Sequence, residues 1–366
     1  MMAPEQDAEA VAERIFNAAL GTIDILSIHL GDRLGWYRSL ASEGPASSAE
    51  LAQRTGTSER YAREWLEQQA VTGLLTALDD DNDKGNDKDD DGGGTCRFSL
   101  PPGTAEVLTD TESLNYLAPL ARMLAGAAVQ LPALQEAYRA GTGVGWSEFG
   151  DDARVAQADM NRPWFERELG NALNQAPELV SRLERAGTMI GDIGCGAGWS
   201  TIALARMYPA AAVTGFDIDA ESIDLARANA TESGSTVEFQ HIDAAGLPSD
   251  RFDAVFAFEC IHDLPYPVEV LTAARQSLRE GGSVVVMDEA VADAFAAPGD
   301  EVERLMYGYS LLICLPDGMA HPKSAGTGTV MRPVTLRKYA LEAGFHDIRT
   351  LPIEGFGFFR FYELVP

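Results

Sequence analysis

The segment 189–200 constrains the fold of this chain more than any other. A short apolar run ends at Asp192 and Ile193, and three glycines follow at every second position. The residues after them, up to Met207, carry apolar side chains at the spacing of an amphipathic helix. Glycine lets a backbone turn sharply and approach a ligand where a Cβ would collide. We therefore predict a strand, a tight loop and a helix, which together begin a βαβ unit.

A second acidic residue stands where the next strand should end. The apolar run 212–216 is followed by Asp217, which lies 23 residues after Gly194. A carboxylate at the tip of the second strand is well placed to accept hydrogen bonds from the two hydroxyls of a ribose. The sequence therefore predicts a cofactor that contains adenosine.

The glycine spacing indicates which cofactor this is. A dinucleotide-binding fingerprint would have its third glycine at position 199, where this chain has Trp199. The chain instead has Asp192 followed by Gly194, Gly196 and Gly198. This pattern resembles motif I of the class I S-adenosylmethionine-dependent methyltransferases.

Three later segments fit the same family in the same order. Residues 239–244 look like the third strand with the acid that contacts adenine, residues 252–259 look like the fourth strand, and residues 278–286 look like a helix end, a Gly-Gly turn and the fifth strand. The resemblance implies an α/β fold, with a seven-stranded Rossmann-like sheet whose last two strands, 346–351 and 357–364, are antiparallel. Helices are expected at 302–315 and 335–343.

The resemblance also implies where the cofactor binds. Ligands of open α/β sheets lie at the carboxyl ends of the strands, so four segments should meet there. The expected contacts are Asp192, Gly194, Cys195, Gly196, Gly198, Asp217, Ile218, Asp243, Ala244, Phe258 and Glu259. In this family, the glycine loop cradles the methionine part and the acid after the second strand holds the ribose. Asp243 would meet the adenine amino group with Ile218 on the ring face, and Asp192 would orient the loop or the methionine amine.

One histidine is the candidate catalytic residue. His262 and Asp263 follow the expected fourth strand, at the position of the His-Asp pair of plant-type O-methyltransferases, where the histidine is the general base. An imidazole that titrates near neutrality suits this role. An equally weighted alternative is that His262 only hydrogen-bonds a loop carbonyl. The four cysteines contain no C-x-x-C pair, so we expect neither a disulfide framework nor a metal site.

The first hundred residues have the pattern of a winged helix. Apolar residues recur every three or four positions over 8–30, which predicts a long amphipathic helix. Two short helices with serine or threonine caps are expected at 47–54 and 57–66, followed by strands at 73–78 and 96–100. The aspartate-rich stretch 79–94 between these strands predicts a disordered insertion.

The winged helix raises the possibility of DNA binding, which the charges oppose. The second short helix offers Arg60 and Arg63, but also Glu59, Glu64 and Glu67, and the net charge of the chain is −28. A DNA reader needs a basic stripe, and an acidic surface repels phosphates. The arrangement is instead similar to actinobacterial small-molecule methyltransferases, in which such a domain implies homodimerisation.

These observations give one primary hypothesis and two alternatives. We expect a winged-helix dimerisation domain at 1–100, a helical connector or lid at 101–186 and an S-adenosylmethionine-binding methyltransferase domain at 187–366. The start of the chain lacks the features of a signal peptide, and no apolar run is long enough to span a bilayer, which predicts a cytoplasmic protein with no membrane or nucleic-acid partner. The expected activity is methyl transfer to a small aromatic or hydroxyl-bearing acceptor. The alternatives are other S-adenosylmethionine chemistry on the same fold, and a cofactor-sensing DNA-binding regulator.

Overall fold

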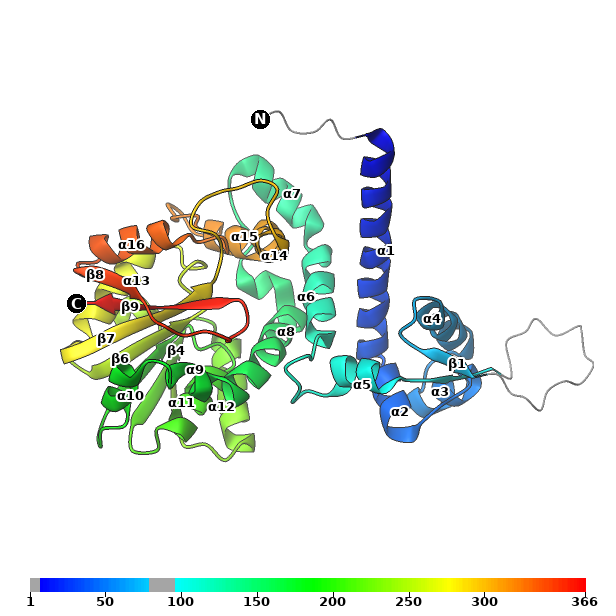
Figure 1. Cartoon of the computed structure of the whole chain (residues 1–366), viewed down its shortest axis with the longest axis horizontal. Helices are drawn as coiled ribbons and strands as arrows, with labels where there is room; N and C mark the ends of the chain where they lie inside the picture. Colours follow the sequence, from blue (N-terminus) through cyan, green and yellow to red (C-terminus); the bar gives the residue numbers. More distant parts are fainter. Residues whose placement is uncertain (1–6, 79–95) are drawn as a thin grey trace, which may run out of the picture. The chain divides into compact units, whose positions relative to one another are not determined.

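The structure is a computed structural model that describes residues 7–78 and 96–366 (Figure 1). The expected insertion at 79–94 lies outside the described residues. The chain divides into two compact units, Met1–Ala125 and Gly126–Pro366. This boundary falls inside the segment 101–186 that we expect to be a connector, and helix α6 (Ala118–Val129) crosses it.

The N-terminal unit contains the predicted winged helix. Its elements are α1 (Ala8–Arg33), α2 (Trp36–Glu43), α3 (Ser48–Thr55), α4 (Glu59–Val71), β1 (Thr76–Leu78), β2 (Arg97–Ser99) and α5 (Pro102–Thr109). A capping box starts α3, because Ser47 accepts a hydrogen bond from the amide of Glu50 and the Glu50 carboxylate accepts one in return. The strands pair as an antiparallel wing. The rings of Trp36 and Trp65, 4.8 Å apart, pack in the core of this unit.

The C-terminal unit begins with helices. They are α7 (Leu131–Ala140), α8 (Trp146–Arg167), α9 (Leu169–Leu173) and α10 (Pro177–Leu183). The long helix α8 is interrupted at Gly150, whose φ of 76° is not helical. Residues 126–186, which lie within the expected connector 101–186, are thus largely helical.

A seven-stranded sheet forms the centre of this unit. Its order is β5 (Glu238–His241), β4 (Ala212–Asp217), β3 (Met189–Ile193), β6 (Phe252–Phe258), β7 (Leu278–Glu289), β9 (Phe359–Val365) and β8 (Asp347–Thr350). The first five are parallel, and β9 is antiparallel to both of its neighbours. The predicted α/β fold class is therefore confirmed. Two boundaries differ from prediction: β5 ends at His241, and β7 already starts at Leu278, so it runs through the Gly-Gly pair.

Helices cover both faces of the sheet, as Figure 1 shows. Helices α11 (Trp199–Met207) and α12 (Ala220–Glu232) lie on one face with α8 to α10, and α13 (Pro267–Gln276) and α16 (Pro333–Glu342) lie on the other. Burial on both faces explains the continuous apolar runs of the central strands, such as Val284 to Met287, which are fully buried. The insertion after β7 forms α14 (Glu301–Tyr309), a π-helical turn η2 (Ser310–Cys314) and α15 (Leu315–Met319).

The strand order reverses at β3. The chain moves from β3 to β4 on one side, and later to β6 on the other. In sheets of this kind, ligands bind at the carboxyl ends of the strands where the order reverses. Over residues 7–78 and 96–366, no helix is long and apolar enough to cross a bilayer.

Candidate active site

The three glycines after β3 have different surroundings. All three have positive φ, at 65° for Gly194, 50° for Gly196 and 82° for Gly198. A Cβ on Gly194 would lie 2.6 Å from Cys260, and one on Gly198 would lie 2.6 Å from the ring of Phe239. A Cβ on Gly196 would have no neighbour within 4 Å. The outer glycines are thus required by packing, whereas the backbone at the middle glycine faces open space.

Asp192, at the end of β3, is completely buried. Its Oδ2 accepts hydrogen bonds of 2.6 Å from the hydroxyls of Ser200 and Thr201, which joins the loop to the start of α11. Its Oδ1 is also buried but accepts no hydrogen bond in the structure. Burial raises the pKa of this carboxyl from 3.8 to about 6. Asp192 therefore has an unused acceptor beside the glycine loop.

The charge of Asp192 makes a prediction about stability. A carboxyl whose pKa is raised by folding destabilises the folded state once it ionises, so this cost grows from pH 3.8 to about 6 and is complete above that. Asp192→Asn removes the cost and retains an acceptor for Ser200 and Thr201. We expect the unfolding free energy of the variant relative to wild type to rise by about 3 kcal/mol between pH 4 and pH 7.5.

Calorimetric unfolding at the two pH values measures this difference, and effects of other titrating groups cancel in the comparison. Asp347→Asn at the edge strand β8 is the control of opposite sign: the amide of Ile348 and the guanidinium of Arg337 lower the pKa of Asp347, so this variant should not gain stability relative to wild type at the higher pH. A difference between Asp192→Asn and wild type that is the same at both pH values would contradict the prediction.

The carboxylate of Asp217 at the end of β4 holds the neighbouring backbone. Its Oδ2 accepts a hydrogen bond of 2.8 Å from the amide of Gly196, and its Oδ1 accepts one of 2.8 Å from the amide of Asp219. Each oxygen has a second lone pair available for a hydroxyl. Burial raises the pKa of Asp217. The next side chain, Ile218, is 65% exposed, which leaves its apolar surface available for an aromatic ring.

The remaining expected cofactor residues differ in their exposure to solvent. Asp243 is exposed and accepts a hydrogen bond of 2.9 Å from the amide of Ala245, so it caps the short 3-10 turn η1 (Ala244–Gly246). Cys195 is buried, and its amide donates to Phe216. Phe258 is buried and stacks on Phe256 with ring centroids 5.3 Å apart. Phe258 and Cys195 are therefore packing residues in this structure, while Asp243 has an accessible carboxylate.

Helix α8 contributes residues that the sequence did not indicate. Arg154 is 5% exposed, and its guanidinium contacts Asp219 at 2.8 Å and Glu221 at 2.6 Å. The guanidinium of Arg162 lies over the ring of Trp199, 4.5 Å from the centroid. Helix α8 thus binds the segments after β3 and β4 through charged side chains. The sequence shows Arg154 and Arg162 in an expected helix, but it does not indicate which residues their guanidinium groups contact.

Glu259, the first residue after β6, has a strained backbone. Its φ is 50°, which is unusual for a residue with a side chain. Burial raises the pKa of its carboxyl to about 7, and Nε2 of Gln157 on α8 lies 3.3 Å from its Oε2. Strain of this kind often occurs at functional sites. Glu259 thus lies at the carboxyl end of β6, the strand that pairs with β3, whose end leads into the glycine loop.

His262 lies in a pocket of carboxylates and is 3% exposed. Its Nδ1 is 3.1 Å from both carboxylate oxygens of Asp288 and 3.3 Å from Oε2 of Glu289. Its Nε2 is 3.4 Å from Oδ1 of Asp263. Burial alone would lower the pKa of His262, but the charges of Asp263, Glu289 and Asp288 outweigh it and raise that pKa well above its usual range.

The two ring nitrogens of His262 contact carboxylates. The alternative in which they bind a loop carbonyl is not what the structure has. Asp288 and Glu289 are the last residues of β7, and sequence reasoning missed them. The apolar run before them ends in two acids at the same sheet edge as β6, which is the signal that could have found them. The backbone carbonyl of His262, by contrast, accepts a hydrogen bond from the amide of Gly328.

Two family profiles match the chain. The profile described as "Methyltransferase domain" matches residues 190–282, which include the glycine loop, Asp217 and His262. The profile described as "Rv2258c-like winged HTH domain" matches residues 22–84. The chain therefore contains a methyltransferase domain over residues 190–282 and a winged-helix domain over residues 22–84. Both domain matches agree with the predicted family resemblance.

Individual relatives agree with this assignment. The ubiquinone biosynthesis O-methyltransferase of Nitrosococcus oceani is 36% identical over 102 residues, or 27% of this chain and 42% of that protein. The protein of the same name from Xanthomonas axonopodis pv. citri is 31% identical over 175 residues, or 46% of this chain and 66% of that protein. The first curated relatives are thus matched over about half of their length.

A solved structure shows the same fold over the full length. Human N-acetylserotonin methyltransferase, solved in complex with S-adenosylmethionine, has a TM-score of 0.70 at 19% identity, with 100% of this chain and 99% of that chain covered. At this identity the likeness concerns the fold. It extends over the winged helix as well as the seven-stranded sheet.

Proposed function

We propose that this protein transfers a methyl group from S-adenosylmethionine to an oxygen of a small aromatic or hydroxyl-bearing acceptor. The observation that carries the proposal is the position of His262 in the loop after β6, with acidic side chains next to both of its ring nitrogens. Cys260, two residues earlier, donates a hydrogen bond of 3.3 Å to the carbonyl of Ile193 beside the glycine loop. The loop that contains the buried His262 is therefore hydrogen-bonded to the end of β3, next to the glycine loop that would hold the cofactor.

The residues at the carboxyl ends of β3 and β4 fit this cofactor. The open backbone at Gly196 can approach the methionine part, and the unpaired Oδ1 of Asp192 can accept a hydrogen bond from its amine. The second lone pairs of Asp217 suit two ribose hydroxyls, and the exposed face of Ile218 suits adenine. Bound S-adenosylmethionine would supply an activated methyl group, so the protein mainly has to align and desolvate the reactants.

His262 would remove the proton of the acceptor hydroxyl. Asp288 contacts Nδ1, which fixes that nitrogen as the proton-bearing one and leaves the lone pair on Nε2, on the side of Asp263. The surrounding carboxylates raise the pKa of the ring, so the neutral form that can accept the proton becomes more abundant as the pH rises, and we expect methyl transfer to rise with pH as well. Asp263, at 3.4 Å from Nε2, would help to keep the imidazolium in place after transfer.

A methyl-labelled cofactor gives the direct test. Incubation with phenols, catechols and aliphatic alcohols should transfer the label to an extractable product, and the position of the label identifies the methylated atom. The names of the matched relatives make O-methylation the expected outcome. Transfer only to nitrogen or carbon would overturn the oxygen assignment, whereas cofactor consumption without transfer would favour other chemistry on this fold.

The winged helix is the basis of the alternative regulatory function. On α4, Arg60 is paired with Glu64 and Arg63 with Glu59, so the two arginines are neutralised by their own helix. A helix that reads DNA needs cations available to phosphates and base edges. This pairing supports the enzyme over the regulator, and salt-sensitive binding to duplex DNA would reverse that preference.

We further propose a cytoplasmic homodimer formed through α1. The four cysteines are free thiols in the structure, as expected in a reducing compartment. The helix α1 exposes a broad apolar stripe, which consists of Val11, Ile15, Phe16, Leu20, Ile23, Leu26 and Leu30. Contiguous apolar surface of this extent usually marks an interaction site. A second copy of the same stripe is the self-complementary partner that a twofold dimer requires.

Charges introduced into this stripe should separate the dimer. Ile15 and Ile23 are 65% and 54% exposed, so Ile15→Asp/Ile23→Asp should leave the fold intact while placing carboxylates in the interface. Light scattering should give the mass of one chain for this variant and of two chains for wild type. The matched control is Ala10→Asp/Asn17→Asp on the opposite face of α1, which should remain dimeric. A variant that stays dimeric would refute the α1 interface.

A further inference from the structure

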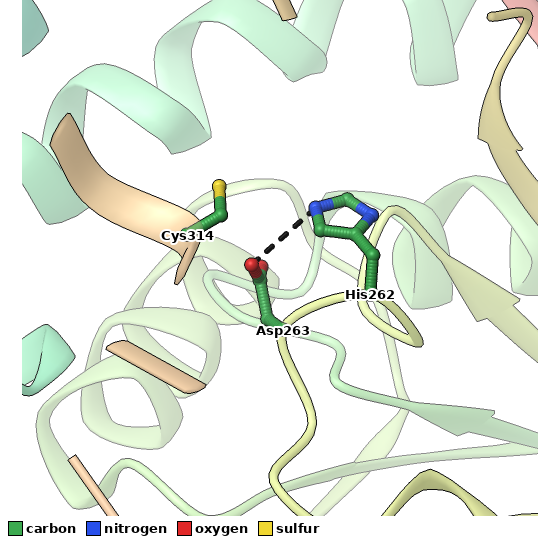
Figure 2. Close-up of side chains that lie close together, drawn as sticks. All are labelled: His262, Asp263 and Cys314. Carbon is green, nitrogen blue, oxygen red and sulfur yellow. Dashed lines mark ion pairs between the residues drawn. The ribbon is translucent and has the colours of Figure 1, made fainter. Parts of the chain in front are cut away.

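The Nε2 side of His262 meets a second pair of side chains. Figure 2 shows the imidazole, the carboxylate of Asp263 and the thiol of Cys314 close together. One ligand atom from each of the three lies within 4.8 Å of the others. Asp263 comes from the same loop as His262, whereas Cys314 comes from the insertion after β7. Cysteine spacing could not reveal this group, because its members lie in separate segments.

The neutral form of His262 has an electrostatic conflict on this side. Asp288 lies 3.1 Å from Nδ1, so the neutral ring has its proton there and a lone pair on Nε2. That lone pair faces Oδ1 of Asp263, a buried atom that accepts no hydrogen bond. Two lone pairs attract each other only through a positive charge between them. That charge is either a proton or a metal ion.

The geometry suits a metal. Zinc binds nitrogen and oxygen ligands at about 2.0–2.2 Å, so two ligands of a tetrahedral site are roughly 3.3–3.5 Å apart. The distance between Nε2 of His262 and Oδ1 of Asp263 is 3.4 Å. The contact from Nδ1 to Asp288 is the outer carboxylate that usually fixes a metal-binding histidine.

Two further observations support a cation at this point. Cys314 ends the π-helical turn η2, and such turns are frequent at functional sites. Among the described residues, His262 is the cationic side chain that forms ion pairs with Asp263, Asp288 and Glu289. Burial raises the pKa of Glu289 well above its usual value, so protonation of that carboxyl removes part of the negative charge, and a divalent ion beside the imidazole would reduce the charge of Asp263 and Asp288 further.

We propose that His262 Nε2, Asp263 Oδ1 and Cys314 Sγ bind one Zn²⁺ ion. A mixed set of imidazole, carboxylate and thiolate ligands favours zinc over magnesium or calcium, which prefer oxygen alone. Binding displaces the thiol proton of Cys314 to solvent and leaves a fourth coordination position for water. Because the ion uses the Nε2 lone pair, a bound ion and proton uptake by His262 exclude each other. This last consequence rests on the function proposed above and makes the site an inhibitory one.

Cobalt substitution tests the binding without any enzyme assay. Co²⁺ added to the full-length, metal-free protein should give a near-ultraviolet thiolate-to-cobalt absorption band at one ion per chain, and Zn²⁺ should remove it. Cys314→Ser should lose the band, while the matched control Cys96→Ser, in the other unit, should keep it. Asp263→Asn should keep the band and weaken Co²⁺ binding at least tenfold. It also serves as the second variant if Cys314→Ser does not fold.

The outcomes separate the site from the proposed function. Absence of the thiolate band in folded wild type, or a band that Cys314→Ser retains, overturns the zinc site and leaves the His262 proton as the charge between the two groups. If the band behaves as expected, Zn²⁺ at the same occupancy should lower methyl transfer at least tenfold, reversibly on chelation. A bound ion with unchanged methyl transfer would retain the metal site and refute the base role of His262.

Discussion

Replacement of His262 by alanine is expected to lower the turnover of methyl transfer about 10²- to 10⁴-fold, which is the usual contribution of a general base. The affinity for S-adenosylmethionine should change little, because the ring contacts Asp288, Glu289 and Asp263 and none of the expected cofactor residues. Single-turnover kinetics with an unactivated phenol, together with calorimetric cofactor binding, measure the two quantities separately.

A pre-ionised acceptor provides the internal control for His262→Ala. A nitrophenol has already lost its proton, so the loss of turnover should shrink with this acceptor. His346→Ala is the matched variant, because His346 is exposed beside β8 at the other end of the sheet. Full turnover of His262→Ala with an unactivated phenol would show that alignment of the reactants alone drives the transfer. The carboxylates of Asp263, Asp288 and Glu289 around His262 would then have a structural role.

The sequence predicted the parts of the fold that local patterns determine. The glycine loop with Asp192, the acid at the end of β4 and the capped helices of the winged helix each leave a short, periodic signature. Boundaries were less accurate where pairing with a neighbour decides them. The strand β7 starts at Leu278 because that residue pairs with Phe252, but the pairing register shifts before Ala254 pairs with Ser283, so the Gly-Gly pair lies in an irregular stretch of the strand.

The candidate site was predictable only in part, for a related reason. His262 was identified because it lies in the short loop after a strand with a recognisable pattern. Asp288 and Glu289 reach it from the neighbouring strand, and Arg154 reaches Asp219 from a helix more than sixty residues earlier. Such contacts depend on tertiary packing, and a single sequence has no periodic signal for them. The burial that alters the charge of Asp192 and Glu259 likewise exists only in the folded chain.

Replacement of Asp217 by alanine should weaken the binding of S-adenosylmethionine at least tenfold. Hydrogen bonds to a charged acceptor contribute roughly 1.5–3 kcal/mol each, and this carboxylate would lose two ribose hydroxyls. It would also release the amide of Gly196, whose contact of 2.8 Å holds the middle of the glycine loop. Calorimetric titration, with the unfolding temperature as a check on the fold, measures the effect. Asp347→Ala at the far edge strand is the matched control and should bind normally. Unchanged affinity in Asp217→Ala would remove this residue from the cofactor site, and with it the reason for placing the ribose at the end of β4.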